Sequence, residues 1–273
     1  MAGYVDGYRN AAAHSIHSYQ PSTQRFAYFK QGVVSSRMES GKALDKQTEK
    51  IIIKERPYIS YNPYFFIPFF IWVVVGGISL LVADKRTLFY MINSRHNDVL
   101  DVLMAWGTRM GELEFSVILL ILLLAFPGLR NRFYVVAALI ANALPSIIVQ
   151  VVKSSINAPR PLNYFKEAPW IHTLPEWHRY MNRSFPSGHT CAAFCLFCFV
   201  SFFLPPRYRP WALVLFVLAL FTGVTRIYLA AHFFLDIYVG SILGTTFTAG
   251  IMYLLEYKSG YFFRHVRKGN AVQ

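Results

Sequence analysis

The chain has 273 residues, of which 55% are hydrophobic and only 15% are charged, and its mean hydropathy is +0.35. Soluble domains carry about 25% charged residues, so these values exclude an ordinary soluble domain and indicate that much of the apolar surface faces lipid. The net charge of +13 does not indicate nucleic-acid binding, because the Lys and Arg residues lie in the tails and in short loops rather than on one polar face. We therefore expect a membrane protein with no nucleic-acid partner.

The first 62 residues are polar and contain no long apolar stretch, so we expect no cleavable signal peptide and take the first apolar segment as the membrane anchor. A helix is possible over 40–54. The chain is thus divided into a cytoplasmic N-terminal tail (1–62), a membrane core (63–256) and a basic cytoplasmic C-terminal tail (257–273).

Six apolar segments follow the tail, and each is expected to be a helix because an isolated segment in lipid must satisfy its own backbone hydrogen bonds. The fourth and fifth are short, so their ends are expected to extend into the neighbouring loops. The predicted fold class is an all-α membrane protein with six transmembrane helices. The segments are Tyr64–Ala83, Gly111–Gly128, Phe133–Val152, His189–Leu204, Trp211–Thr225 and Phe233–Leu255.

The distribution of positive charge predicts the orientation. With the N-terminus in the cytoplasm, 17 of the 27 Lys and Arg residues lie on the inside, and both tight turns on that side are basic. This agrees with the rule that short cytoplasmic loops are enriched in Lys and Arg. The compact loops are typical of a bacterial protein, so we expect the bacterial inner (cytoplasmic) membrane, with both termini cytoplasmic.

Three connections then lie on the periplasmic side, at about 84–110, 153–188 and 226–232. Residues Asn97–Met110 have the apolar spacing of an amphipathic helix at the membrane interface. The second connection is the longest, and its Trp and Tyr residues are typical of a membrane surface.

Several polar residues lie at the periplasmic ends of these segments. Insertion of a charged residue into a spanning helix costs about 2.5–3.5 kcal/mol of free energy, so charged residues at such positions indicate a function. Phosphoryl transfer is such a function, because its transition state spreads negative charge over three oxygens that fixed cations and N–H groups can stabilise. Lys153, Arg160 and Arg226 would supply the cations. Ser187 and Gly188, at the start of a helix, would supply a hydroxyl and an amide for a phosphate oxygen.

Two histidines complete this predicted site. His232 and Asp236 are four residues apart, so on one helical face the carboxylate can hold one ring nitrogen and leave the other free to attack phosphorus. His189 is then available as the general acid that protonates the departing oxygen. The other six histidines are expected to be structural.

The same residues resemble a known family. Lys153–Pro161 reads Lys-x6-Arg-Pro, Pro186–His189 reads Pro-Ser-Gly-His, and Thr225–Asp236 reads Thr-Arg-x5-His-x3-Asp. This pattern resembles the three-part signature of the type 2 phosphatidic acid phosphatase (PAP2) family, although Thr225 stands where the family usually has Ser. The resemblance implies a six-helix core and a phosphatase that needs no metal or other cofactor and forms a phosphohistidine intermediate. It also implies the roles assigned above.

The predicted function is removal of phosphate from a membrane lipid phosphate or pyrophosphate at the periplasmic face. Phosphorylated lipid A, phosphatidylglycerophosphate and undecaprenyl pyrophosphate are the candidate substrates. Two alternatives remain open: phosphotransfer between lipids at the same site, and a non-catalytic membrane scaffold. Lys166, Arg179 and Arg183 either contact a second phosphate or are solvated. Three cysteines at helical spacing (Cys191, Cys195 and Cys198) are expected to pack against a neighbouring helix.

Overall fold

The computed structural model describes residues 52–54, 59–129, 131–175, 177–258 and 264–266. The chain divides into two compact units, one of residues 56–263 and the other of residues 1–55 together with 264–273. In the latter, strands β1 (Ile52–Lys54) and β2 (Arg264–Val266) form an antiparallel pair. The possible helix over 40–54 is therefore wrong for its last three residues, and its remainder lies outside the described residues.

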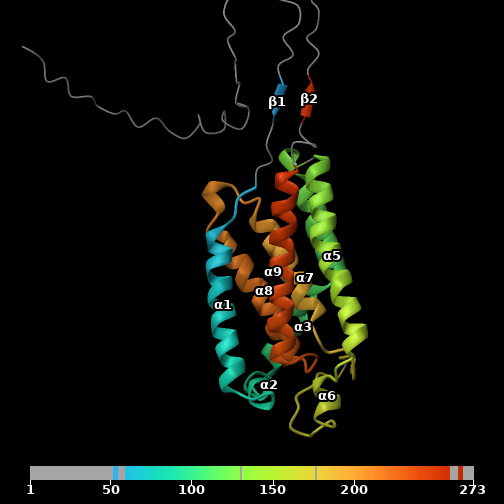
Figure 1. Ribbon diagram of the computed structural model, residues 1–273. Coiled ribbons are helices and arrows are strands. Elements are labelled where there is room, and N and C mark those ends of the chain that lie inside the picture. Colours follow the sequence, from blue (N-terminus) through green and yellow to red (C-terminus); the bar gives the residue numbers. More distant parts are fainter. Residues whose placement is uncertain (1–51, 55–58, 130, 176, 259–263, 267–273) are drawn as a thin grey trace, which may run out of the picture. The chain divides into compact units, whose positions relative to one another are not determined.

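The described residues of the unit 56–263 form helices and connecting loops (Figure 1). The all-α class is therefore confirmed for this core unit. Its elements are α1 (Pro63–Val82), α2 (Lys85–Asn93), α3 (Asp98–Gly107), η2 (Thr108–Gly111), α4 (Leu113–Ala125), η3 (Pro127–Leu129), α5 (Arg132–Ile156), α6 (Pro161–Tyr164), α7 (Gly188–Ser201), η4 (Pro206–Tyr208), α8 (Trp211–Tyr228) and α9 (Phe234–Tyr257).

Each of the six apolar segments forms a helix at the predicted place, namely α1, α4, α5, α7, α8 and α9. Four of them, α1, α5, α8 and α9, are long and apolar enough to cross a membrane. The other two, α4 and α7, have 13 and 14 residues. The membrane-spanning character is thus borne out for four helices, and a count of six crossings stays a prediction.

One end of α1 is fixed to α7 and α8 by a single buried amide. Asn62 caps α1, since its side chain accepts a hydrogen bond from the Tyr64 amide at 3.1 Å. Its Nδ2 donates to the carbonyls of Ser201 (3.4 Å) and Arg209 (3.1 Å). Asn62 is fully buried, and a buried amide needs such partners. The start of α1, the end of α7 and the start of α8 therefore lie at one level.

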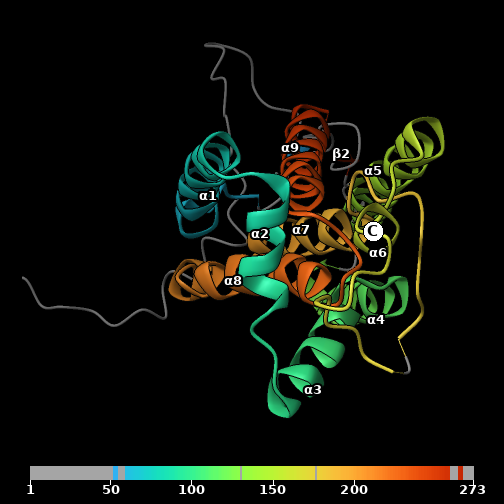
Figure 2. The same cartoon turned by 90° about the horizontal axis from the view of Figure 1, so that it is seen from below.

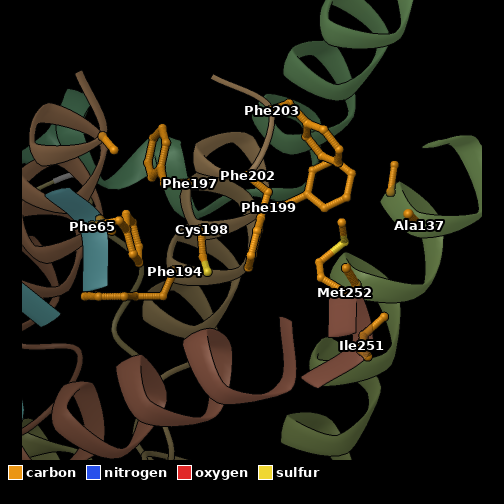
Figure 3. Close-up of a cluster of buried hydrophobic side chains, with 14 of the residues drawn as sticks. Phe65, Ala137, Phe194, Phe197, Cys198, Phe199, Phe202, Phe203, Ile251 and Met252 are labelled. Atoms are coloured by element: carbon orange, nitrogen blue, oxygen red, sulfur yellow. The ribbon is translucent and has the colours of Figure 1, made fainter. Parts of the chain in front are cut away.

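Helix α7 lies at the centre of the core unit, and none of its residues is exposed. Seen along the helices, α7 lies between α5, α8 and α9 (Figure 2). Aromatic side chains of α7 and its C-terminal turn pack between Phe65 of α1 on one side and Met252 and Ala137 on the other (Figure 3). The three cysteines are also fully buried, which confirms their interpretation as packing residues. Because α7 is covered on all sides, it needs no polar face.

Two glycines of α9 allow it to pack closely against α7. A Cβ atom at Gly240 would lie 2.7 Å from the Ser187 carbonyl oxygen, and one at Gly244 would lie 2.6 Å from the Cys191 carbonyl oxygen. Glycines four residues apart form the small-residue face on which membrane helices approach each other closely. The absence of side chains at Gly240 and Gly244 therefore allows the short distance between α7 and α9.

The predicted amphipathic helix over 97–110 corresponds to α3 and the following η2. Its apolar side chains Val99, Val102, Leu103 and Trp106 are 50–76% exposed. The helix is therefore present, and its position at a membrane interface stays a prediction.

The close α7–α9 contact predicts the effect of a methyl group. Gly244→Ala should lower the free energy of unfolding by about 1–3 kcal/mol, because overpacking forces backbone shifts against the Cys191 carbonyl and Phe194. Unfolding of the detergent-solubilised protein by heat or denaturant measures this. Gly250→Ala on the same helix is the matched control, since a Cβ there meets nothing within 4 Å. Equal stability of the two variants would contradict the close packing.

Candidate active site

The predicted site residues lie on segments that hydrogen bonds join to one another. The chain after α5 pairs with the segment before α7: the Arg160 amide donates to the Met181 carbonyl (2.8 Å), and the Ser184 amide donates to the Ala158 carbonyl (2.9 Å). The Ser187 amide donates to the Asp236 carbonyl at 3.0 Å, which joins the start of α7 to α9. The three parts of the sequence signature are therefore connected through their backbones.

A tight turn between α8 and α9 positions His232. The Arg226 carbonyl, near the end of α8, accepts hydrogen bonds from the amides of Ala231 (2.9 Å) and His232 (3.0 Å). Ala230 has a φ of 51°, in the left-handed region, which reverses the chain. His232 is consequently held beside the last turn of α8 and is only 1% exposed.

The Asp236 carboxylate lies behind His232. Its Oδ2 is 3.4 Å from His232 Nδ1, although Nδ1 has no hydrogen-bond partner among the described residues. The same Oδ2 accepts hydrogen bonds from the Phe233 amide (2.9 Å) and from the Ser184 hydroxyl (2.5 Å). The predicted adjacency of His232 and Asp236 is found, and Ser184 is a supporting residue that the sequence analysis missed.

Arg160 connects the long loop to the histidine turn. Its Nε donates to the Asn182 carbonyl (2.9 Å), and its two terminal nitrogens donate to the carbonyls of Ala231 (3.1 Å) and Arg183 (3.4 Å). A guanidinium has five N–H groups, so two are left for an anion. Arg160 therefore holds the backbone of the site together as well as contributing charge.

The Arg226 side chain is buried and only partly hydrogen-bonded among the described residues. One terminal nitrogen donates to the Thr108 hydroxyl oxygen at 2.7 Å, and both residues are buried. The Arg226 Nε atom is buried and has no hydrogen-bond partner among the described residues. An unpaired buried donor is costly, so a ligand oxygen at this position would be strongly favoured.

The start of α7 supplies further donors. Ser187 is the N-cap: its hydroxyl oxygen accepts hydrogen bonds from the Thr190 amide (3.3 Å) and the Thr190 hydroxyl (2.8 Å), which leaves its own proton free to donate. A Cβ on Gly188 would lie 3.6 Å from the Lys153 ammonium nitrogen, so this cation adjoins the first turn of α7. The N–H groups of a first helical turn favour an anion.

The environment keeps His232 in its neutral form. Burial lowers the pKa of the His232 imidazole well below its usual value, and the positive charges of Arg160 and Arg226 lower it further. His189, the second residue of α7, lies within electrostatic range of His232 and the same cations. A neutral imidazole keeps a free electron pair for attack on an electrophile.

The buried charges near the predicted site are unequal in sign. Among the described residues, the buried ionic side chains are those of Lys153, Arg160, Arg226 and Asp236, so three cations face one carboxylate. Buried charges without partners are strongly unfavourable. The buried cations therefore outnumber the buried carboxylate among the described residues, and the binding of an anion by the eight predicted residues stays a prediction.

Aromatic side chains of the long loop cover two of the cations, which the sequence analysis did not foresee. The Arg160 guanidinium lies 4.7 Å from the Tyr180 ring centre, and that of Arg226 lies 5.8 Å from the Trp177 ring centre. The aromatic content of this loop was assigned to the membrane surface. Of the loop charges, Arg179 forms an exposed pair with Glu167 at 3.9 Å.

Fold and site together describe a helical protein with helices apolar enough to cross a membrane and a buried group of three cations. The model of the PAP2 superfamily matches residues 133–259, which include every predicted site residue. Undecaprenyl-diphosphatase BcrC of Bacillus subtilis (strain 168) is 31% identical over 150 residues, which are 55% of this chain and 72% of that protein. The chain belongs to the PAP2 superfamily and is an integral membrane lipid phosphatase.

One further relative and two solved structures are also similar to this chain. The bacitracin transport permease protein BcrC of Bacillus licheniformis is 30% identical over 115 residues, 42% of this chain and 52% of that protein. The crystal structure of Aquifex aeolicus LpxE matches with a TM-score of 0.52 and 27% identity, over 63% of this chain and 96% of that one. A PAP2-type phosphatidylglycerolphosphate phosphatase from Bacillus subtilis has the same fold at 19% identity, with a TM-score of 0.53 over 71% and 97% of the two chains.

The contact between Ser184 and Asp236 predicts a loss of activity without unfolding. Ser184→Ala removes one hydrogen bond to a buried carboxylate, so kcat for phosphate release should fall about tenfold. Ser184→Thr, which keeps the hydroxyl, should retain most activity. Ser201→Ala is the matched control, because that buried hydroxyl donates within α7 at its other end. If Ser184→Ala and Ser201→Ala had the same kcat, Ser184 would have no role in holding Asp236.

Proposed function

We propose that this protein removes phosphate from a membrane lipid phosphate or pyrophosphate at the periplasmic face, without a metal ion, through a phosphohistidine intermediate. The observation that carries the proposal is the excess of buried positive charge around a buried neutral imidazole. Three fixed cations can stabilise the charge that develops on the equatorial oxygens in phosphoryl transfer.

His232 is the nucleophile in this mechanism. The phosphate is held by Lys153, by the remaining N–H groups of Arg160 and Arg226, and by the first turn of α7 at Ser187 and Gly188. His232 attacks phosphorus with one ring nitrogen, and the bond between phosphorus and the leaving oxygen breaks. Asp236 stabilises the ring as it becomes positively charged, because its Oδ2 lies 3.4 Å from Nδ1.

His189 is the proton donor for the leaving oxygen, and then the base that activates water to hydrolyse the phosphohistidine. Support for this role is its position. It follows Gly188 in the first turn of α7, the turn that the Lys153 ammonium group adjoins. Free phosphate and the regenerated imidazole complete the cycle.

The lipid nature of the substrate is supported by the family and by the long apolar helices around the site. The relative named undecaprenyl-diphosphatase places undecaprenyl pyrophosphate first among the substrates to be tested. Phosphorylated lipid A and phosphatidylglycerophosphate, the other two candidates from the sequence, are tested beside it.

Substitution of His232 tests the nucleophile. His232→Ala should abolish phosphate release and the trapping of labelled phosphate on the protein, because no other group can form the intermediate. A panel of undecaprenyl pyrophosphate, phosphatidylglycerophosphate, phosphorylated lipid A and phosphatidate in detergent provides the assay. The exposed His178, which packs against Tyr180, gives the matched control His178→Ala.

The same assay separates the alternatives. Activity of the unmodified protein should persist in EDTA, and vanadate should inhibit it by resembling the five-coordinate transition state. Strict dependence on added metal, or full activity of His232→Ala, would overturn the mechanism. Phosphate that appears only on a second lipid would identify a phosphotransferase, and a protein inactive on all four lipids would favour the scaffold.

The periplasmic orientation is tested by cysteine labelling in intact cells. The three native cysteines are buried, so an introduced cysteine reports its own position. Arg95→Cys, exposed between α2 and α3, should react with a membrane-impermeant thiol reagent. Arg207→Cys, exposed in η4, should react only after the membrane is permeabilised. The reverse pattern would place the site in the cytoplasm.

A further inference from the structure

The short helix η2 (Thr108–Gly111) lies outside the three signature segments and outside the predicted site, yet it contacts two residues of that site. The hydroxyl oxygen of Thr108 accepts a hydrogen bond from the Arg226 guanidinium at 2.7 Å. A Cβ atom on Gly111 would lie 2.7 Å from the carbonyl oxygen of His189 and 2.8 Å from its Cβ. This helix therefore touches both Arg226 and His189.

The Thr108 contact is buried on both sides. Thr108 is fully buried and Arg226 is 2% exposed. The Arg226 side chain donates a hydrogen bond to Thr108. Its Nε atom has no hydrogen-bond partner among the described residues. A guanidinium is planar and rigid, so fixing one terminal nitrogen restricts the direction of the remaining N–H groups. Thr108 thus determines how Arg226 presents its free donors.

The segment that carries Thr108 is itself fixed to α8. A Cβ atom on Gly107 would lie 2.3 Å from the Phe221 ring, so the backbone of α3 lies directly on that side chain. Further along, the Tyr228 hydroxyl donates a hydrogen bond to the Asp101 carboxylate. Contacts at Phe221 and Tyr228 lie on either side of Arg226 in α8. The position of Thr108 relative to Arg226 is therefore well defined.

We propose that Thr108 is a positioning residue that orients Arg226 for the anion, and that Gly111 is required for the close approach of η2 to His189. The inference rests on the proposed function, because it assigns Thr108 a role through the anion-binding Arg226. It adds a fourth segment, from the connection between the first two apolar segments, to the three that carry the signature.

Two substitutions of Thr108 test the role of its hydroxyl oxygen as a hydrogen-bond acceptor. Thr108→Val removes the hydroxyl oxygen, and the resulting misorientation should lower kcat/KM for phosphate release about 10- to 100-fold. The vanadate inhibition constant should rise about tenfold, because vanadate resembles the transition state that Arg226 stabilises. Thr108→Ser keeps the acceptor and should stay within about threefold of the unmodified protein.

A matched control and a double substitution separate positioning from stability. Thr222→Val removes a buried hydroxyl of α8 that donates only within its own helix, and it should leave kcat/KM unchanged. Arg226→Lys should lower kcat/KM by itself, and adding Thr108→Val should then have little further effect, because the two act through one group. Additive losses would show that Thr108 acts independently of Arg226.

The failure of this inference is distinct from the failure of the proposed function. Equal kcat/KM and vanadate inhibition for Thr108→Val and the unmodified enzyme would overturn the positioning role while leaving the phosphatase intact. An unmodified protein with neither phosphatase activity nor inhibition by vanadate would instead overturn the function, and this inference with it. If Thr108→Val does not fold, Thr108→Ala removes the same acceptor without a branched side chain.

Discussion

The structure depends on holding three cations close together where water is scarce. Lys153, Arg160 and Arg226 are buried near a single buried carboxylate, Asp236, and like charges at this distance repel. Neutral oxygen atoms accept hydrogen bonds from two of these cations: Arg160 donates to three backbone carbonyls, and Arg226 donates to the Thr108 hydroxyl oxygen. These contacts stabilise the guanidinium groups without neutralising them. The site therefore keeps a net positive charge, and an incoming phosphate can supply the missing negative charge.

The same contacts explain why chain segments far apart in sequence must pack as they do. Arg160 joins the chain after α5 to the turn after α8, because it donates to the carbonyls of both Asn182 and Ala231. Each carbonyl stabilises the positive charge of Arg160 and also connects its own chain segment to Arg160. The buried amide of Asn62 does the same at the opposite end, where it joins the start of α1 to α7 and α8. Polar groups thus fix both ends of an otherwise apolar bundle.

Long apolar runs were sufficient to predict α1, α4, α5, α7, α8 and α9, because such runs are local features of the chain. The eight candidate site residues were predicted from their spacing and from the family resemblance, and their roles stay predictions. Ser184 and Thr108 could not be predicted in this way. Each is a common polar residue whose role comes from one contact with a distant residue, Asp236 or Arg226. Whether α7 crosses the membrane could not be predicted from its sequence alone. This helix has only 14 residues and no exposed side chain, so its position depends on the helices packed around it.

Helix lengths place the site at a particular depth. The start of α1 and the end of α7 are level, because Asn62 contacts Ser201. From this level, the 20 residues of α1 rise about 30 Å and the 14 residues of α7 about 21 Å, at 1.5 Å per residue. Arg226, in the sixteenth position of α8, rises about 24 Å by the same measure. Arg226 and the start of α7 therefore differ in height by only about 3 Å and lie roughly 6–9 Å short of the end of α1. Since about 30 Å also matches the hydrocarbon core of a bilayer, a phosphate bound by these residues would lie below the end of α1. Such a depth would favour a substrate whose hydrocarbon chains stay in the membrane while its phosphate reaches the cations.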